Sequence, residues 1–310
     1  YFYIHNKAKA CKKIDLKRNY YLKEVLEITK HRYYNSNMFL KGKIYNESKN
    51  TTEERELFCK SIPILDPIHV VNNNYNLVNH NNYHLPSNYN YNTFHKINDM
   101  NNTAYIDVLC SFLFGNLTYY KKNPSFPLYY GSVNGIGDYN YDLTEDYDDI
   151  KNDRCFNENI DKGFKLEIYV SDDENSSDEE DENKNDSDSD NESDKSDKSS
   201  VDEKYKDDSF DDCIAKLLKI PIQLLFIEKL EGTLEDLLDE DIKEEVLLSC
   251  IFQISFALTY LQKHYQFTHN DLHINNIMFK KTDKKFFYYK MNNIYYQIPT
   301  FGLIFKIIDF

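Results

Sequence analysis

The acidic segment at residues 171–208 constrains the fold of this chain more than any other feature, because it interrupts every apolar pattern. Residues 171–212 carry 20 Asp or Glu and 5 Lys, so the tract alone accounts for the net charge of −15 of the whole chain. So few apolar side chains cannot offset the entropy cost of ordering, and we expect a disordered insertion that suits a basic partner. The remaining residues are neutral overall and indicate no nucleic-acid binding.

A second stretch, residues 72–92, is rich in Asn and Tyr and predicts another large loop. The chain has 310 residues, enough for two lobes, and its six cysteines lack CxxC spacing, which argues against a zinc site and favours a cytoplasmic location. Residues 246–261 form the longest apolar stretch, which is too short and too interrupted for a membrane span. The sequence begins at Tyr1 and ends at Phe310, and we expect a fragment of a longer protein.

The first half of the chain contains strand and helix patterns between these breaks. Residues 38–65 predict two strands around a polar turn. Residues 101–120 predict a helix capped by Asn102 or Thr103. Residues 126–137 predict a strand that runs into a glycine-containing turn, "GSVNGIG", between two strands. This half is therefore expected to be rich in sheet.

The second half begins with a short apolar strand at residues 220–230, followed by a capped turn at residues 233–236. A long helix comes next, with Asp241 and Glu244 at the spacing of a capping box. Residues 284–310 predict three strands, of which the first two flank an Asn-Asn turn. A sheet-rich part before a helical part predicts an α+β fold.

The sequence "HNDLHINN", residues 269–276, places Asp271 and Asn276 five positions apart just after the predicted long helix. Asp309 follows at the end of an apolar strand. Phosphoryl transfer needs one carboxylate near the acceptor hydroxyl and oxygen ligands for the Mg²⁺ that binds the phosphates. Three such side chains in this order predict a catalytic base at Asp271 and metal ligands at Asn276 and Asp309.

These residues also carry a resemblance to a known family. "HNDLHINN" resembles the catalytic loop of the protein-kinase-like superfamily, and "KIIDF", residues 306–310, resembles its metal-binding Asp-Phe. "LLFIEKLEGTLEDLL", residues 224–238, is similar to the hinge between the two lobes and the first helix beyond it. His273 and the 38 positions from Asp271 to Asp309 are closest to haspin-like kinases or divergent kinases of giant DNA viruses.

The resemblance implies a two-lobe kinase fold, with a small sheet-rich lobe at residues 1–230 and a partial helical lobe at residues 231–310. It implies ATP and Mg²⁺ as cofactors and a Ser/Thr hydroxyl of a protein as substrate. The backbones of Glu228 and Leu230 would bind adenine, with Ile227 as the gatekeeper behind it. His269 would support the catalytic loop.

The lysine that binds the ATP phosphates has two candidates under this resemblance. Lys60, in "ELFCK", would be the lysine of the Val-Ala-x-Lys strand, and Asp107 would stand where the family has its partner Glu. The competitor is Lys96, eleven positions before Asp107. The choice of Lys60 requires a long connection between strand and helix.

The sequence departs from the family pattern in ways that keep two other interpretations open. No G-x-G-x-x-G precedes Lys60, and Asn270 and His273 stand where most protein kinases carry Arg and Lys. A small-molecule phosphotransferase of the aminoglycoside or choline kinase type is one alternative, because such enzymes also place His two positions after the catalytic Asp. A pseudokinase scaffold is the other, because the glycine-rich loop is absent.

Overall fold

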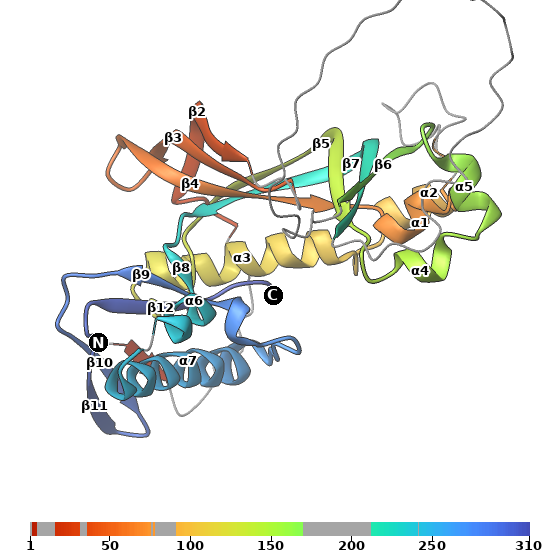
Figure 1. The fold of residues 1–310 in the computed structure, drawn as a ribbon. Coiled ribbons are helices and arrows are strands. Elements are labelled where there is room, and N and C mark those ends of the chain that lie inside the picture. The colour runs from red at the N-terminus through yellow and green to blue at the C-terminus, as the bar shows by residue number, and fades with distance from the viewer. Residues whose placement is uncertain are drawn as a thin grey trace, which may run out of the picture.

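The computed structural model describes residues 2–4, 16–31, 36–75, 77, 91–169, 212–240 and 242–310. Within these residues the fold is mixed α+β, with a curled antiparallel sheet in the N-terminal part and the longest helix in the C-terminal part (Figure 1). The expectations for the acidic tract up to residue 211, for most of the loop at 72–92 and for Asp241 lie outside the described residues. The expected α+β class is confirmed.

The main sheet has six strands in the order β2-β3-β4-β7-β5, with β6 also paired to β7, and all these pairs are antiparallel. The bounds of its strands are β2 Tyr20–His31, β3 Met38–Asn46, β4 Thr51–Pro63, β5 Tyr129–Asp142, β6 Phe164–Tyr169 and β7 Asp212–Glu228. The two strands expected within residues 38–65 are confirmed as β3 and β4. The strand expected at residues 220–230 is only the second half of the much longer β7.

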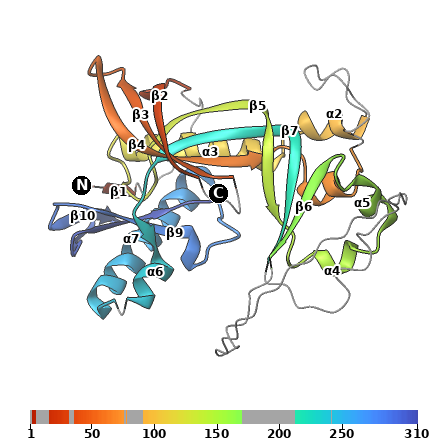
Figure 2. The same cartoon turned by 45° about the horizontal axis from the view of Figure 1, so that its top comes forward.

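Five helices accompany this sheet: α1 Pro67–Val71, α2 Tyr91–Ile97, α3 Thr103–Tyr119, α4 Tyr147–Ile150 and α5 Arg154–Asn159. The long helix α3 runs under the sheet, whereas α1, α4 and α5 pack around the far ends of β5, β6 and β7 (Figures 1 and 2). That far end has its own apolar core, which includes Val71, Leu143, Phe156, Phe164 and Leu217. The small lobe is therefore extended by a second packed unit.

Asn102 fixes the start of α3, as the sequence predicted. Its side-chain oxygen accepts a hydrogen bond from the amide of Ala104 at 3.0 Å, and its Nδ2 donates to the carbonyl of Ile64 at 2.8 Å. The first contact caps the helix, and the second ties the helix start to the end of β4. This residue therefore sets how α3 lies relative to the sheet.

The C-terminal part holds two helices and two small sheets below the main sheet (Figure 1). Strand β8 pairs with β9, which pairs with β12, and strand β1 pairs in parallel with β10, which pairs with β11. The bounds are β1 Phe2–Ile4, β8 Gly232–Thr233, α6 Leu234–Asp239, α7 Glu244–Tyr265, β9 Ile277–Lys281, β10 Phe286–Met291, β11 Ile294–Pro299 and β12 Leu303–Ile307. The three strands predicted within residues 284–310 and the capping box of Thr233 with Asp236 are confirmed.

The predicted turn "GSVNGIG" is wrong, because these residues lie inside the continuous strand β5. The pairing of β5 with β7 shifts register between Tyr129 and Gly131 and again between Gly137 and Tyr139. Gly131 has φ of 146°, a backbone conformation that favours glycine. The glycines therefore mark β-bulges that bend a long strand, and not a reversal of the chain.

The predicted capping box of the long helix is also wrong. Helix α7 begins at Glu244 after Lys243, which makes no side-chain cap, and Glu244 and Glu245 instead place negative charge in the first turn. By length and composition α7 could cross a membrane, which the shorter stretch 246–261 did not suggest. Its Cys250 and Ala257 are buried in the core, and core helices commonly have such a composition.

Gly115 allows α3 to approach β5 closely. A Cβ atom at this position would lie 2.9 Å from both the carbonyl oxygen of Pro127 and the amide nitrogen of Tyr129. We expect Gly115→Ala to lower the free energy of unfolding by about 1 to 3 kcal/mol, because helix or strand must shift. Urea denaturation measures this loss, with Gly135→Ala, whose Cβ would meet nothing, as the control.

Candidate functional site

A cavity of about 440 Å³ is lined by side chains from the main sheet, α3 and the C-terminal part. Its size falls in the range typical of small-molecule sites. Every residue predicted for the site except Asp271 lines this cavity: Lys60, Asp107, Ile227, Glu228, Leu230, Asn276 and Asp309. Residues from five separate stretches of sequence are thus brought together.

Lys60 is the centre of the polar end of the cavity. Its Nζ lies 2.7 Å from Oδ2 of Asp107 on α3 and also bonds Oδ1 of Asp309. Burial alone would lower the pKa of Lys60, but the charges of both carboxylates outweigh burial and raise it. The lysine therefore carries a charge at neutral pH and neutralises two acids from different parts of the fold.

The competing lysine lies elsewhere. Nζ of Lys96 is 2.8 Å from Oδ1 of Asp66, at the end of α2. Lys60 reaches the cavity because side chains alternate along β4, so that Cys59 is buried in the opposite core while Phe58 and Lys60 face the same side. The structure thus places Lys60, and not Lys96, beside Asp107.

The catalytic-loop sequence folds as a 3₁₀ turn, Ile274–Asn276, held by hydrogen bonds of its own. Nδ2 of Asn276 lies 2.9 Å from the carbonyl of Asp271 and 3.0 Å from Nε2 of His273. Asn276 is buried, whereas the Asp271 side chain is exposed. Asn276 and Asp309 therefore share the cavity lining, and Asp271 is tied to them through its main chain.

The segment that carries Asp309 is fixed from both sides. The amide of Ile308 donates to the carbonyl of Asn276 at 3.1 Å, and the Ile308 carbonyl lies 2.8 Å from Nε2 of the buried His269. The ring of Phe310 packs edge-on against Phe114 of α3 at 4.8 Å between centroids. His269 thus supports the Asp309 segment, in line with its expected structural role.

Oxygen ligands for a divalent cation are present at this end of the cavity. Asp309 offers a carboxylate, and both hydrogen bonds of the Asn276 amide use Nδ2, which leaves Oδ1 without a partner among the described residues. A carboxylate and an amide oxygen suit Mg²⁺, which completes its shell with water and phosphate oxygens. Within the described part of the chain, no three His, Cys, Asp or Glu side chains form a cluster of their own that could hold a metal.

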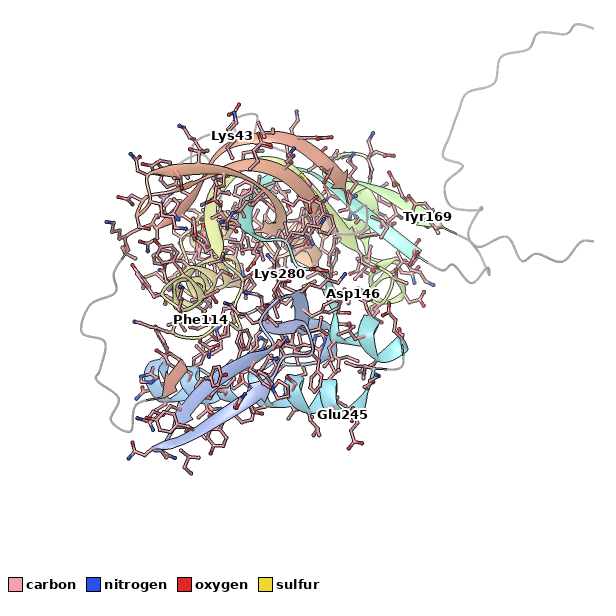
Figure 3. All side chains as sticks on the ribbon, turned by 90° about the vertical axis from the view of Figure 1, so that its left-hand side faces the viewer. Lys43, Phe114, Asp146, Tyr169, Glu245 and Lys280 are labelled. Carbon is pink, nitrogen blue, oxygen red and sulfur yellow. The ribbon has the colours of Figure 1, made fainter. Side chains whose placement is uncertain are left out.

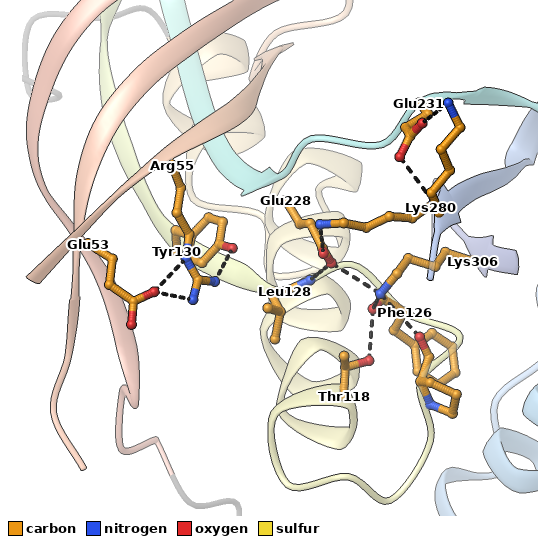
Figure 4. A network of polar contacts seen from close by, with 12 residues as sticks. Glu53, Arg55, Thr118, Phe126, Leu128, Tyr130, Glu228, Glu231, Lys280 and Lys306 are labelled. Carbon is orange, nitrogen blue, oxygen red and sulfur yellow. Dashed lines mark hydrogen bonds and ion pairs between the residues drawn. The ribbon is translucent and has the colours of Figure 1, made fainter. Parts of the chain in front are cut away.

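A buried network around Glu228 joins the two parts of the molecule, and the sequence did not predict it (Figure 4). The Glu228 carboxylate lies 2.5 Å from Nζ of Lys280, 3.1 Å from Nζ of Lys306 and 3.1 Å from the amide of Leu128. Nζ of Lys306 also donates to the carbonyl of Phe126 at 2.8 Å. Figure 3 shows Lys280 at the level where the main sheet meets the C-terminal strands.

Charge decides the protonation state of this network. Burial would raise the pKa of Glu228, but Lys306 and Lys280, together with hydrogen bonds from Lys280 and Leu128, lower it to about 2. Glu228 was expected to act through its backbone, and its side chain has a separate structural role. The apolar residues around Lys306 in "LIFKIIDF" were the only sequence feature that could have suggested a buried lysine.

Comparison with known proteins adds no relative to this description. No protein-family profile matches the chain, and no curated protein matches its sequence. The function is therefore inferred from the geometry of the cavity.

Proposed function

We propose that the full-length protein transfers the γ-phosphoryl group of Mg-ATP to a Ser or Thr hydroxyl of a protein substrate, on a protein-kinase-like two-lobe fold. One observation carries the proposal: Lys60, Asp107 and Asp309 meet in one cavity, two residues of which also include the amide ligand Asn276 and the linking-segment residue Leu230. A cation beside carboxylate and amide oxygens matches what a nucleotide's phosphates and their metal require.

Each residue has a role in this proposal. Lys60 binds phosphate oxygens and is oriented by Asp107, and Asn276 and Asp309 hold Mg²⁺. When bound, Mg²⁺ neutralises charge on the phosphates. The acceptor oxygen forms a bond to the γ-phosphorus while the bond from that phosphorus to the bridging oxygen breaks, and its electron pair leaves with ADP. Asp271 accepts the proton of the acceptor hydroxyl.

A small-molecule hydroxyl is the second candidate acceptor, and the position of His273 favours it. His273 contacts Asn276 directly, two positions after the proposed base. Parallel assays with a Ser/Thr peptide library and with aminoglycosides and choline separate the two substrate classes. Turnover with peptides alone supports the proposal, whereas turnover with the small molecules alone favours the second candidate.

Nucleotide binding provides the first test. We expect calorimetry on the full-length protein to detect Mg-ATP binding, and Lys60→Met to weaken it by about ten- to a hundredfold, because a charge-assisted contact to phosphate is lost. Lys96→Met removes a lysine paired outside the cavity and serves as the matched control. Absence of Mg-ATP binding by the wild-type protein contradicts the proposal, and an effect of Lys96→Met alone contradicts the choice of lysine.

A further inference from the structure

The end of the cavity opposite the acids has an aromatic roof. Phe39 of β3 pairs with Phe58 of β4, and Phe58 pairs with Ile227 of β7, so that the three residues are neighbours across three strands. All three line the cavity. Phe58 stands two residues before Lys60 on the same strand, so the roof and the cation follow each other along one wall.

The two phenylalanine rings lie together and are only half-buried. Their centroids are 5.4 Å apart with an interplanar angle of 53°. Nζ of Lys229 lies 5.6 Å from the centroid of Phe39 and pairs with Glu56 at 2.9 Å. The cavity keeps its volume of about 440 Å³ with both rings in place, so the rings border the space and do not fill it.

Met278 and Leu230 line the same cavity from the C-terminal part. Met278 supplies a polarizable thioether, which contacts aromatic rings favourably. The amide of Leu230 has no hydrogen-bond partner among the described residues, in contrast to that of Glu231, which donates to Phe279. A flat group between these walls would find apolar surface on both faces and one backbone donor at its edge.

The polar side chains at this end are already engaged. Thr233 caps α6, Lys229 pairs with Glu56, and the Glu228 carboxylate is held by Lys280 and Lys306. Ring faces thus contribute more to recognition here than free polar groups do. Stacking on aromatic side chains grows with the size of the base and contributes about 1 to 3 kcal/mol per base.

We propose that Phe58, together with Phe39, determines the specificity of this site for purine nucleoside triphosphates by stacking on the base. The proposal rests on the proposed function, because it takes the Lys60 end as the phosphate end. Phe58 acts on the base alone, so its removal leaves phosphate binding intact. This separates stacking from a general loss of the cavity.

The test compares ligands with and without a base. Calorimetry on the full-length protein uses Mg-ATP, Mg-CTP and Mg-tripolyphosphate with Phe58→Ala, Phe58→Leu and Phe58→Tyr. We expect Phe58→Ala to weaken Mg-ATP by about tenfold or more, to reduce the preference for ATP over CTP and to leave Mg-tripolyphosphate within about twofold. Phe58→Leu keeps apolar volume and should still lose most of the ATP affinity, whereas Phe58→Tyr should retain it.

Phe286→Ala removes an exposed ring from β10 and is the matched control, with thermal unfolding of every variant measured in parallel. Tighter or unchanged ATP binding by Phe58→Ala overturns the inference, because the ring would then obstruct the base or play no part. Equal losses for Mg-ATP and Mg-tripolyphosphate overturn it as well. A wild-type protein that binds neither ligand contradicts the proposed function itself, which is a separate outcome.

Discussion

Replacing Asp271 with Asn in the full-length protein should lower kcat for phosphoryl transfer by about 10² to 10⁴, the usual contribution of a general base. The carboxamide keeps the size of the side chain but cannot accept the proton of the acceptor hydroxyl. Asn276 is held by the main-chain carbonyl of Asp271, which the substitution does not remove. Mg-ATP affinity should therefore stay within about twofold of the wild-type value.

The measurement is steady-state turnover combined with calorimetry on the same preparations. Asp283→Asn makes the same chemical change at an exposed position between β9 and β10 and should leave both quantities unchanged. Wild-type turnover in Asp271→Asn contradicts the assignment of the base. A parallel loss of Mg-ATP binding would instead show that the loop has lost its shape.

The second large effect concerns stability. Glu228→Gln should lower the free energy of unfolding by about 3 to 5 kcal/mol, because Lys306 would remain buried beside carbonyls without a countercharge. Lys306→Met should cost a similar amount by leaving Glu228 with the half-exposed Lys280. The double variant Glu228→Leu/Lys306→Met removes both charges and should recover much of the loss.

Acid should reduce this difference in a defined pH range. The folded-state pKa of Glu228 is about 2, below the ordinary value of 4.5, so its charge stabilises the fold above pH 4.5. That contribution is lost as the pH falls from about 4.5 through 2 and the carboxyl takes up a proton. Urea denaturation of wild type and Glu228→Gln between pH 7 and 3 measures it, and a constant difference over that range argues against the ion pair as its source.

Much of the site could be predicted because its residues are close in sequence or lie at the ends of regular elements. Asp271 and Asn276 are joined by one short turn, and Asp309 directly follows an apolar strand. Lys60 could be selected because β3 and β4 form a simple hairpin with a clear alternation. Such local patterns depend on chain geometry that neighbouring residues already determine.

The rest depended on contacts that the sequence does not encode locally. The direction in which Glu228 points, and its pairing with Lys306, follow from how β7 and β12 lie relative to each other. The bulges at Gly131 and Gly137 resembled a turn, because glycine suits both. The first strand of the sheet, β2, was missed because its outer residues Val25 and Ile28 are exposed and its pairing with β3 contains three irregularities.

The position of the acidic tract has an evolutionary consequence. Tyr169 ends β6 and Asp212 begins β7, and these two residues face each other in the ladder, so the tract leaves and re-enters the fold at a single rung. The entropy cost of closing such a connection rises by only about 0.6 kcal/mol for each doubling of its length. Insertions and deletions between these two strands can therefore accumulate in related genes as nearly neutral changes, while the cavity on the other side of the sheet keeps its geometry.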